Sequence, residues 1–305
     1  MDVTIAICTR NRAQVLDGAL ASVARMRIPE GISWELVIVN NASTDDTETI
    51  IGKYADSLPI RYHVEPRPGV SNARNRAVGA AAGTYMAWTD DDVLLDKEWL
   101  AAYLNAFRRW PEATLFGGRI TPLLEEPVPD WLRESWDLVA DAFARRDFGD
   151  EPLPLTLEGN RLPFGANFAA RTNELRVHPF DPKLGPAPGK VILGEEMVLF
   201  EAILRSGRTG YWVPEAKVLH RIPQPRQTLQ FLGSFYTALG RGNAYREREK
   251  IVPFLFGAPR WLWRRAIVSG LQYRLRRFTS RPTVWLKDYI SHAVDRGALE
   301  YWLSR

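Results

Sequence analysis

The chain has 305 residues, a formal net charge of +4 and a pI near 9.2, and its 46% hydrophobic and 25% charged residues are ordinary for a globular protein of one or two domains. Its single cysteine, Cys8, excludes an intramolecular disulfide framework and favours a reducing compartment. No apolar run approaches the ~18 residues of a spanning helix, and the first residues lack a signal-peptide pattern. We therefore expect a soluble or surface-bound cytoplasmic protein.

Strand and helix patterns alternate through the first third of the chain. Compact or alternating apolar runs predict strands at 3–8, 35–39, 60–64 and 84–89. Helical patterns follow each strand, among them a run rich in Ala and Gly at 71–82 and an amphipathic run at 96–109. This alternation predicts an α/β fold with a mostly parallel, twisted sheet and flanking helices.

The pattern is looser in the middle of the chain. Residues 121–163 contain many prolines and are expected to extend over the edge of the site rather than to join the sheet. After this segment, strands are predicted at 164–171, 211–213 and 217–219, and helices at 195–206 and 227–245.

Three carboxylates, Asp90, Asp91 and Asp92, stand where the strand 84–89 ends. The carboxyl ends of strands in an open α/β sheet border the ligand crevice. Adjacent carboxylates repel by roughly 3 kcal/mol at ~5 Å and an effective dielectric near 20, so a partly buried triplet needs a cation. The Asp-x-Asp spacing suits Mg²⁺ or Mn²⁺, which takes its other ligands from water and phosphates. The alternative is a solvated turn whose acids cap the next helix.

Several other residues are candidates, but each has a simpler explanation. Glu195 and Glu196 open a predicted helix and could merely complement its dipole. His220 ends a predicted strand, and a lone histidine is more often structural than a metal ligand. Arg74 lies on a helix preceded by a glycine and could face phosphates or be solvated. The order of these residues along the chain, rather than any one of them, is informative.

That order resembles the family 2 glycosyltransferases, which are inverting enzymes with the GT-A fold. Six pieces carry the resemblance and cover most of residues 3–221. They are TIAICTRNR at 4–12, ELVIVNNASTDDT at 35–47, PGVSNARNRAVGAAAGTYMAWTDDDV at 68–93, FGANFAAR at 164–171, FDPKLGPAPGKVILGEEMVLFEAIL at 180–204 and AKVLHR at 216–221.

The resemblance implies a set of residues around a nucleotide-sugar donor. They are Thr9, Arg12, Asn40, Asn41, Arg74, Asp90, Asp91 and Asn167. The first four would surround the base and ribose, and Arg74 would lie beside the nucleotide. Asp90 would lie near the ribose or donor sugar, Asp91 fills the variable middle position, and Asn167 would lie on the strand beneath the donor sugar.

The resemblance also implies a metal site and a general base. Asp92 would bind a divalent cation, Mn²⁺ or Mg²⁺, with Asp90 and His220 beside it. Glu196 matches the aspartate of a Glu-Asp pair that acts as general base. Because a glutamate is one methylene longer, the role could shift to Glu195.

A second departure from the family pattern concerns the nucleotide. Many members have an acid where this chain has Asn40 and Asn41, and an asparagine carbonyl accepts a base N–H without bringing a charge. The identity of the nucleotide base in the donor therefore stays open: a UDP-sugar is favoured, with GDP- and dTDP-sugars as alternatives.

The function implied by the resemblance is a metal-dependent, inverting sugar transfer to an acceptor hydroxyl, in polysaccharide, glycolipid or other cell-envelope glycan synthesis. The acceptor would be a glycan or a lipid-linked molecule. Residues 1–222 would form the GT-A catalytic domain, with 121–163 as a variable insertion on the acceptor side, and residues 223–305 a helical C-terminal region.

The C-terminal region is basic and rich in tryptophan. From Ile251 onward, ten Lys or Arg residues face three acids. This composition suits helices that lie on an anionic membrane, here the inner face of the cell membrane. The alternative is a helical annex whose tryptophans pack on the catalytic domain and whose arginines are solvated.

Other functions explain less of the sequence. A sugar-nucleotidyltransferase should have a glycine-rich phosphate loop after the first strand, where this chain has CTRNR. A nucleic-acid-binding module built on the basic tail would leave the aspartate triplet and the glutamate pair unexplained, so no nucleic acid partner is expected. A catalytically inactive relative that still binds nucleotide-sugar or membrane remains an alternative.

Overall fold

The computed structural model describes residues 1–189, 191–249 and 252–304. The chain forms two compact units. The first comprises Met1–Leu123, Ala144–Lys183 and Glu195–Arg221, and the second comprises Leu124–Phe143, Leu184–Gly194 and Ile222–Arg305. Two segments from the middle of the chain thus group with the C-terminal helices. The two units are described separately below.

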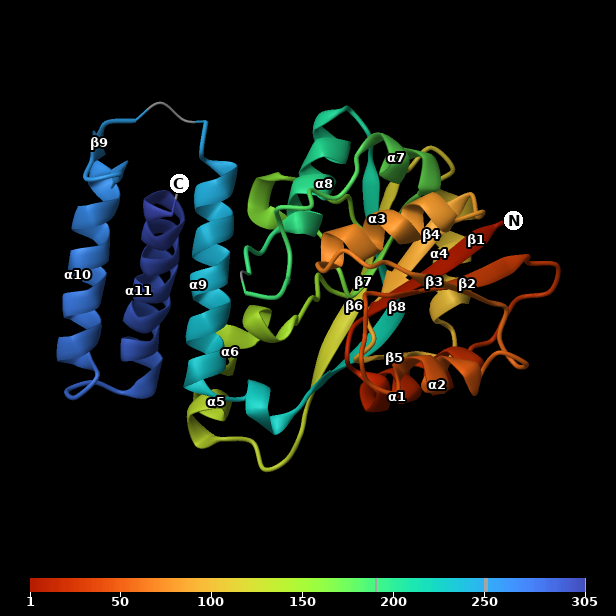
Figure 1. The fold of residues 1–305 in the computed structure, drawn as a ribbon, viewed down its shortest axis with the longest axis horizontal. Helices are drawn as coiled ribbons and strands as arrows, with labels where there is room; N and C mark the ends of the chain where they lie inside the picture. The colour runs from red at the N-terminus through yellow and green to blue at the C-terminus, as the bar shows by residue number, and fades with distance from the viewer. Residues whose placement is uncertain (190, 250–251, 305) are drawn as a thin grey trace. The chain divides into compact units, whose positions relative to one another are not determined.

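An eight-stranded sheet organises the first unit (Figure 1). In spatial order, its strands are β3 (Ile60–Val64), β2 (Trp34–Asn40), β1 (Val3–Thr9), β4 (Tyr85–Thr89), β7 (Asn167–Arg171), β6 (Leu115–Leu124), β8 (Gly210–Ile222) and β5 (Val93–Leu95). The first four are parallel to one another. By contrast, β7 is antiparallel to β4 and β6, and β5 is antiparallel to β8. The predicted α/β class, with flanking helices on a mostly parallel sheet, is confirmed.

The strands differ from the prediction in the part of the sheet that follows β7. No strand is predicted at β6, whose residues 121–124 lie in the segment 121–163 that was expected not to join the sheet. The two short strands predicted at 211–213 and 217–219 are one 13-residue strand, β8, which continues through Pro214. The three-residue strand β5 was not predicted. It is too short to give a periodic signal, and it forms because Val93 and Leu95 pair with His220 and Val218 of β8.

Helices cover both faces of the sheet because side chains alternate along each buried strand. Val3, Ile5 and Ile7 of β1 contribute to one hydrophobic cluster, whereas Ala6 contributes to the other. The helices that contribute to the first are α1 (Ala13–Ala24), α2 (Thr47–Gly52) and α4 (Trp99–Arg109), and those that contribute to the second are α3 (Val70–Ala80), α7 (Thr172–Val177) and α8 (Glu195–Arg205). In Figure 1, α1 and α2 lie on the opposite side of β1 and β2 from α3.

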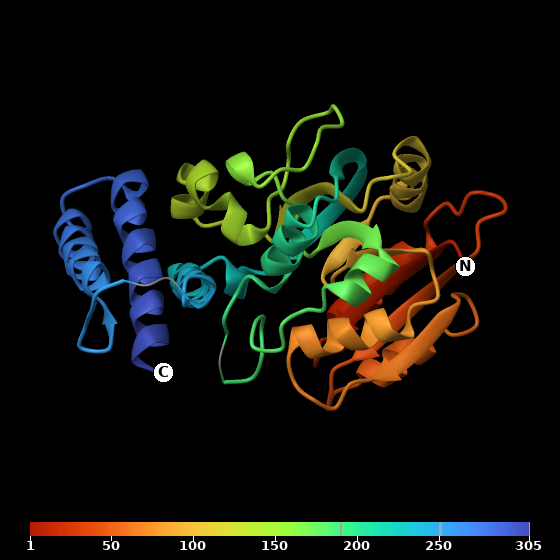
Figure 2. The ribbon, with the colours of Figure 1, turned by 90° about the horizontal axis from the view of Figure 1, so that it is seen from above.

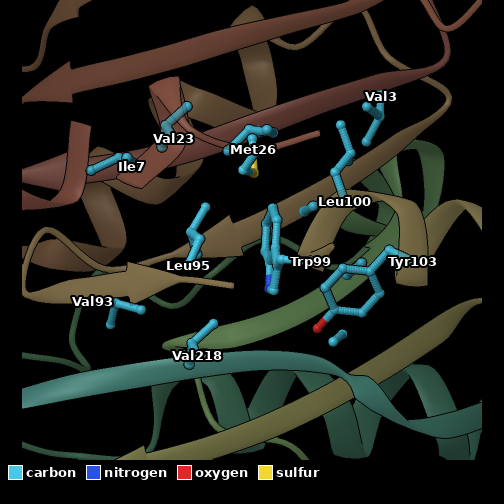
Figure 3. Close-up of a cluster of buried hydrophobic side chains, with 14 of the residues drawn as sticks. Val3, Ile7, Val23, Met26, Val93, Leu95, Trp99, Leu100, Tyr103 and Val218 are labelled. Carbon is cyan, nitrogen blue, oxygen red and sulfur yellow. The ribbon is translucent and has the colours of Figure 1, made fainter. Parts of the chain in front are cut away.

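Trp99 lies at the centre of the first cluster. Figure 3 shows Met26, Leu95, Leu100, Tyr103 and Val218 arranged around its ring. Its indole is fully buried and stacks edge-on against Tyr103, with ring centroids 5.2 Å apart. Burial of a ring of this size fixes α4 against the sheet and thereby supports the segment that follows the end of β4.

The second unit is helical. Its helices are α5 (Asp130–Glu134), α6 (Trp136–Val139), α9 (Leu229–Arg246), α10 (Arg260–Arg276) and α11 (Pro282–Leu303), with short 3₁₀ turns at Ala140–Phe143 and Gln224–Arg226. A further 3₁₀ turn, Glu158–Asn160, belongs to the first unit. Strands β9 (Phe254–Leu255) and β10 (Ala258–Pro259) form a small hairpin before α10. Helix α11 packs against both α9 and α10, and Figures 1 and 2 both show α10 and α11 side by side.

Within the described residues, no helix combines the length and the apolarity needed to cross a bilayer.

Glycines allow α9 and α11 to approach closely. A Cβ atom added at Gly297 of α11 would overlap the carbonyl oxygen of Thr237 on α9, and one added at Gly240 of α9 would overlap the carbonyl oxygen of Val294 on α11. The two backbones are therefore in direct contact along this seam, which leaves no room for a side chain at either position.

We expect Gly297→Ala to destabilise the protein by about 1–3 kcal/mol, because the helices must move apart to accept the methyl group. Gly79→Ala is the matched control: Gly79 also lies inside a helix, but a Cβ atom there meets no atom within 4 Å. The control should be neutral or stabilising by roughly 0.5–1 kcal/mol. Urea unfolding followed by circular dichroism measures both, and equal midpoints for the two variants would contradict the close packing.

Candidate functional site

The aspartate triplet follows β4, the fourth strand of the parallel part of the sheet. Its three side chains have different surroundings: Asp91 and Asp92 are 3% exposed as residues, whereas the Asp90 side chain is 40% exposed. The carboxyl end of the neighbouring strand β1 brings Thr9 to the same place. The triplet is thus not a solvated turn, and each carboxylate has its own partners.

Asp91 is held by the segment that follows β1. Thr9 Oγ1 donates to Asp91 Oδ2 at 2.7 Å, and Arg12 Nη1 lies 2.8 Å from Asp91 Oδ1. Burial removes water from this carboxyl and, despite Arg12, raises the pKa of Asp91 to about 7. Asp91, the variable middle residue of the triplet, therefore contacts both Thr9 and Arg12.

Asp92 lies between Arg12 and His220. Arg12 Nη2 donates to Asp92 Oδ2 at 2.7 Å, and His220 Nε2 lies 3.3 Å from Asp92 Oδ1. The β5–β8 pairing causes this juxtaposition, because Val93 is in register with His220 and the Arg221 amide donates to the Asp92 carbonyl at 2.9 Å. Asp92 and His220, 128 positions apart in the sequence, thus meet as predicted.

Arg74 joins the triplet to the start of α8. Its guanidinium is buried, with Nη1 3.1 Å from Glu195 Oε1 and Nη2 3.7 Å from Asp90 Oδ1. Burial by itself lowers the pKa of Arg74, but the nearby carboxylates, first that of Glu195, outweigh it and raise the pKa above its ordinary value. Arg74 is therefore a fixed positive charge between two carboxylates from distant parts of the chain.

Two residues that were given no role in the sequence analysis shape the surroundings of Arg74. The Phe180 ring centroid lies 5.4 Å from its guanidinium carbon. A Cβ atom at Gly165 would come within 2.7 Å of Arg74 Nη2, so the glycine leaves room for the guanidinium. Both residues lie inside the motifs FDPKLG and FGANFAAR, which could have pointed to them.

The two glutamates at the start of α8 have different environments. Glu195 is buried and pairs with Arg74, whereas Glu196 is half-buried. Burial, reinforced by the charge of Glu196, raises the pKa of Glu195 to about 8, although Arg74 opposes the shift. The charge of Glu196 also acts on Arg74. Both glutamates thus belong to the electrostatic group around Arg74.

Asn40 and Asn41 bind the protein itself. Asn41 Nδ2 donates to the carbonyls of Glu65 and Arg67 at 2.9 and 2.8 Å, and its Oδ1 accepts from the Gly69 amide at 2.8 Å. Asn40 Nδ2 donates to the Tyr62 hydroxyl at 2.9 Å. Asn41 therefore fixes the loop that leads into α3, the helix that carries Arg74, whereas Asn40 bonds to a side chain of β3.

Asn167 is in register with Thr89, the residue that precedes the triplet, and its side chain is buried in the core. Its Oδ1 accepts from Trp99 Nε1 and the Tyr103 hydroxyl at 2.8 and 2.7 Å. Its Nδ2 donates to the carbonyls of Arg119 and Ala216 at 2.9 and 2.8 Å. The fully buried amide thus uses both donors and both acceptor positions inside the protein, tying β7 to α4, β6 and β8.

The donor set fits a metal that is shared with a ligand. Among the residues that the structure describes, no group of three or more His, Cys, Asp or Glu side chains is placed to hold a metal by itself. Asp92 and His220 supply two adjacent ligand groups, and Asp90 is nearby in the chain. Mg²⁺ commonly binds one or two carboxylates and takes its remaining ligands from phosphates and water. These residues therefore fit a cation that binds together with a diphosphate.

Comparison with known proteins identifies the family of the chain. The sequence model of Glycosyl transferase family 2 matches residues 4–165, more than half of the chain. The succinoglycan biosynthesis protein ExoM of Rhizobium meliloti (strain 1021) is 24% identical over 237 residues, which cover 76% of this chain and 71% of that protein.

Two solved structures show the same fold. The mannosyltransferase PcManGT from Pyrobaculum calidifontis, in complex with GDP-Man and Mn²⁺, has a TM-score of 0.65 and 18% identity, and the match covers 99% of this chain and 87% of that one. S. aureus TarS 1–349 in complex with UDP-GlcNAc has a TM-score of 0.58 and 15% identity, with coverage of 98% and 92%. These likenesses confirm the predicted GT-A fold.

The matching family model extends from β1 through the aspartate triplet to Gly165 beside Arg74, so it includes the elements that build most of the site. The chain is therefore a glycosyltransferase and belongs to glycosyl transferase family 2.

Proposed function

We propose that this enzyme transfers a sugar, with inversion, from a nucleotide-sugar donor to an acceptor hydroxyl, with a divalent metal bound beside the donor diphosphate. One observation carries the proposal: the buried guanidinium of Arg74 contacts both Asp90, at the end of β4, and Glu195, at the start of α8. Donor-binding and proton-accepting carboxylates on these two elements would then lie within reach of one bound donor.

On this proposal, residues 1–222 form the catalytic domain and residues 121–163 lie on its acceptor side. The names of similar proteins support the choice of substrates. The two solved structures contain UDP-GlcNAc or GDP-Man, which supports a nucleotide-sugar donor, and ExoM is named for succinoglycan biosynthesis. We propose a UDP-sugar first, GDP- and dTDP-sugars as alternatives, and a glycan or lipid-linked acceptor in cell-envelope glycan synthesis.

Asp92 and His220 would hold the cation, Mn²⁺ or Mg²⁺. When bound, it neutralises the negative charge that grows on the leaving diphosphate. Arg12 now contacts Asp92 Oδ2, and its side chain is 38% exposed, so a bound cation could replace Arg12 Nη2 at that oxygen. Thr9 would keep Asp91 in place throughout.

Glu196 is the proposed general base. A half-buried carboxylate can meet an acceptor hydroxyl from solvent, take its proton and leave the oxygen free to attack the anomeric carbon. Because one displacement inverts the configuration, the chain needs no second carboxylate as nucleophile. Glu195, whose Oε1 is already 3.1 Å from Arg74, would position the guanidinium.

Replacement of the base should abolish turnover but not binding. We expect Glu196→Gln to lower kcat by about 10²–10⁴-fold, since the amide cannot accept the proton, with little change in the nucleotide Kd. Glu48→Gln, an exposed glutamate in the first turn of α2, is the matched control and should behave as wild type. Initial rates of nucleoside diphosphate release measure kcat, and calorimetry measures Kd.

Near-normal turnover of Glu196→Gln would remove Glu196 as the base. The pH profile then tests Glu195. Its pKa of about 8 means that it is mostly protonated at pH 7, so a reaction that uses it as base would have a kcat/KM that rises with pH and levels off above about 8. If Glu195 only positions Arg74, Glu195→Gln should retain part of the activity. If the wild type shows this rise of kcat/KM with pH and Glu195→Gln has no activity, Glu195 is the base.

Removal of the metal ligand should weaken binding of the diphosphate only when metal is present. For Asp92→Ala, calorimetry with UDP or GDP should show a loss of the affinity gain that Mn²⁺ gives the wild type. Asp56→Ala, an exposed aspartate outside the site, is the control. An Mn²⁺-dependent gain that survives in Asp92→Ala would exclude Asp92 as a metal ligand.

The donor base can be found by thermal stabilisation. A ligand at about 100 times its Kd stabilises the folded state by about 2.7 kcal/mol, so the correct donor should raise Tm most in a panel of UDP-, GDP- and dTDP-sugars with Mn²⁺. We expect the UDP-sugars to give the largest shift. Product analysis of the same samples separates the alternatives: a nucleoside diphosphate indicates transfer or hydrolysis, a nucleoside triphosphate formed only when pyrophosphate is added indicates a sugar-nucleotidyltransferase, and binding without turnover indicates an inactive relative.

A further inference from the structure

Helix α10 has two apolar faces, of which only one is covered. Its buried residues, Leu262, Ala266 and Ser269, follow one side of the helix, and α10 packs against α11. On the opposite side, a row of large apolar side chains is exposed. They are Ile267, Val268, Leu271, Leu275 and, just past the helix end, Phe278, with exposed fractions of 59%, 43%, 53%, 70% and 85%. Their spacing of three or four residues makes them one continuous stripe.

The hairpin before α10 exposes further apolar side chains. Phe254, Leu255 and Phe256 are 50%, 42% and 82% exposed, and Trp261 in the first turn of α10 is 43% exposed. The hairpin is tied to the helix, because Trp263 Nε1 donates to the Leu255 carbonyl at 2.7 Å. Exposed aromatic residues next to an apolar stripe are typical of segments that enter the interface of a bilayer.

The charges around this stripe are all positive. The sequence has no Asp or Glu between Val252 and Lys287. The acids of α11 are engaged: Asp288 with Arg276, Asp295 with Arg265, and Glu300 with Arg241. The exposed arginines left over pair with no carboxylate in the described part of the chain. They are Arg260, Arg264, Arg274, Arg277 and Arg281.

We propose that the exposed side of α10, with Phe278 and the β9–β10 hairpin, binds the surface of an anionic phospholipid bilayer, with the helix lying in the membrane plane. The apolar stripe would enter the acyl region, and the arginines around it would reach anionic headgroups along their aliphatic stems. A second copy of the chain fits less well, because apposing two such faces would bring arginines together without carboxylates between them.

Flotation of the full-length protein tests the proposal. We expect the wild type to float with vesicles that contain phosphatidylglycerol, to float much less with phosphatidylcholine alone, and to be released by salt, which screens the arginines. The double variant Leu275→Asp/Phe278→Asp should lower the partition coefficient at least about tenfold, since two apolar anchors become anions beside anionic lipid. Val177→Asp is the matched control, because Val177 is 67% exposed on α7.

Circular dichroism and metal-dependent donor binding establish that the variants are folded, and they also separate this proposal from the proposed catalytic function. Three results would overturn the membrane site: a wild type that stays at the bottom of the gradient with anionic vesicles, equal flotation with neutral and anionic lipid, or wild-type flotation of the double variant. Light scattering that finds a dimer broken by the double variant, without flotation, would instead assign the face to a second copy of the chain.

Discussion

A buried guanidinium governs the geometry of the site. Arg74 cannot release its proton, so its charge must be matched where it is buried, and the matching groups are the carboxylates of Asp90 and Glu195. This requirement links the helix α3, the end of β4 and the start of α8. Arg74 on α3 and Glu195 on α8 are more than a hundred positions apart in the sequence. Gly165 allows this arrangement, because a Cβ atom there would come within 2.7 Å of Arg74 Nη2.

The same reasoning explains how three adjacent aspartates are tolerated. Their mutual repulsion requires positive charge, and the folded chain supplies it from two sides: Arg74 lies toward Asp90, while Arg12 contacts both Asp91 and Asp92. In the folded protein, guanidinium groups supply the positive charge around the triplet. A divalent metal at Asp92 would add its positive charge to that of the two guanidinium groups. It would share Asp92 with Arg12, whose side chain is partly exposed to solvent.

The parts of this structure that could be predicted are those set by local pattern. The apolar runs of β1, β2 and β4 are strands because almost every side chain in them is buried. The contact of Asp92 with His220 depends instead on the β5–β8 pairing, and only the family resemblance indicated it. Strand β5 could not be predicted, since its three residues become a strand only through pairing with β8. Asn41 and Asn167 show a second limit. An amide has the same chemistry whether it binds a nucleotide or the protein, and only the tertiary hydrogen bonds reveal which partners it has.

The start of α8 shows how one helix can separate two roles. Successive residues on an α-helix point about 100° apart, so when Glu195 is turned inward to Arg74, Glu196 must point elsewhere. The inward carboxyl group loses water and its pKa rises, while its Oε1 accepts a hydrogen bond from Arg74 Nη1 at 3.1 Å. The half-buried neighbour keeps access to solvent and hence to an acceptor hydroxyl. On the proposed function, the glutamate pair at this position would combine a positioning group and a proton acceptor, and the longer side chain of glutamate would only extend the reach of the second.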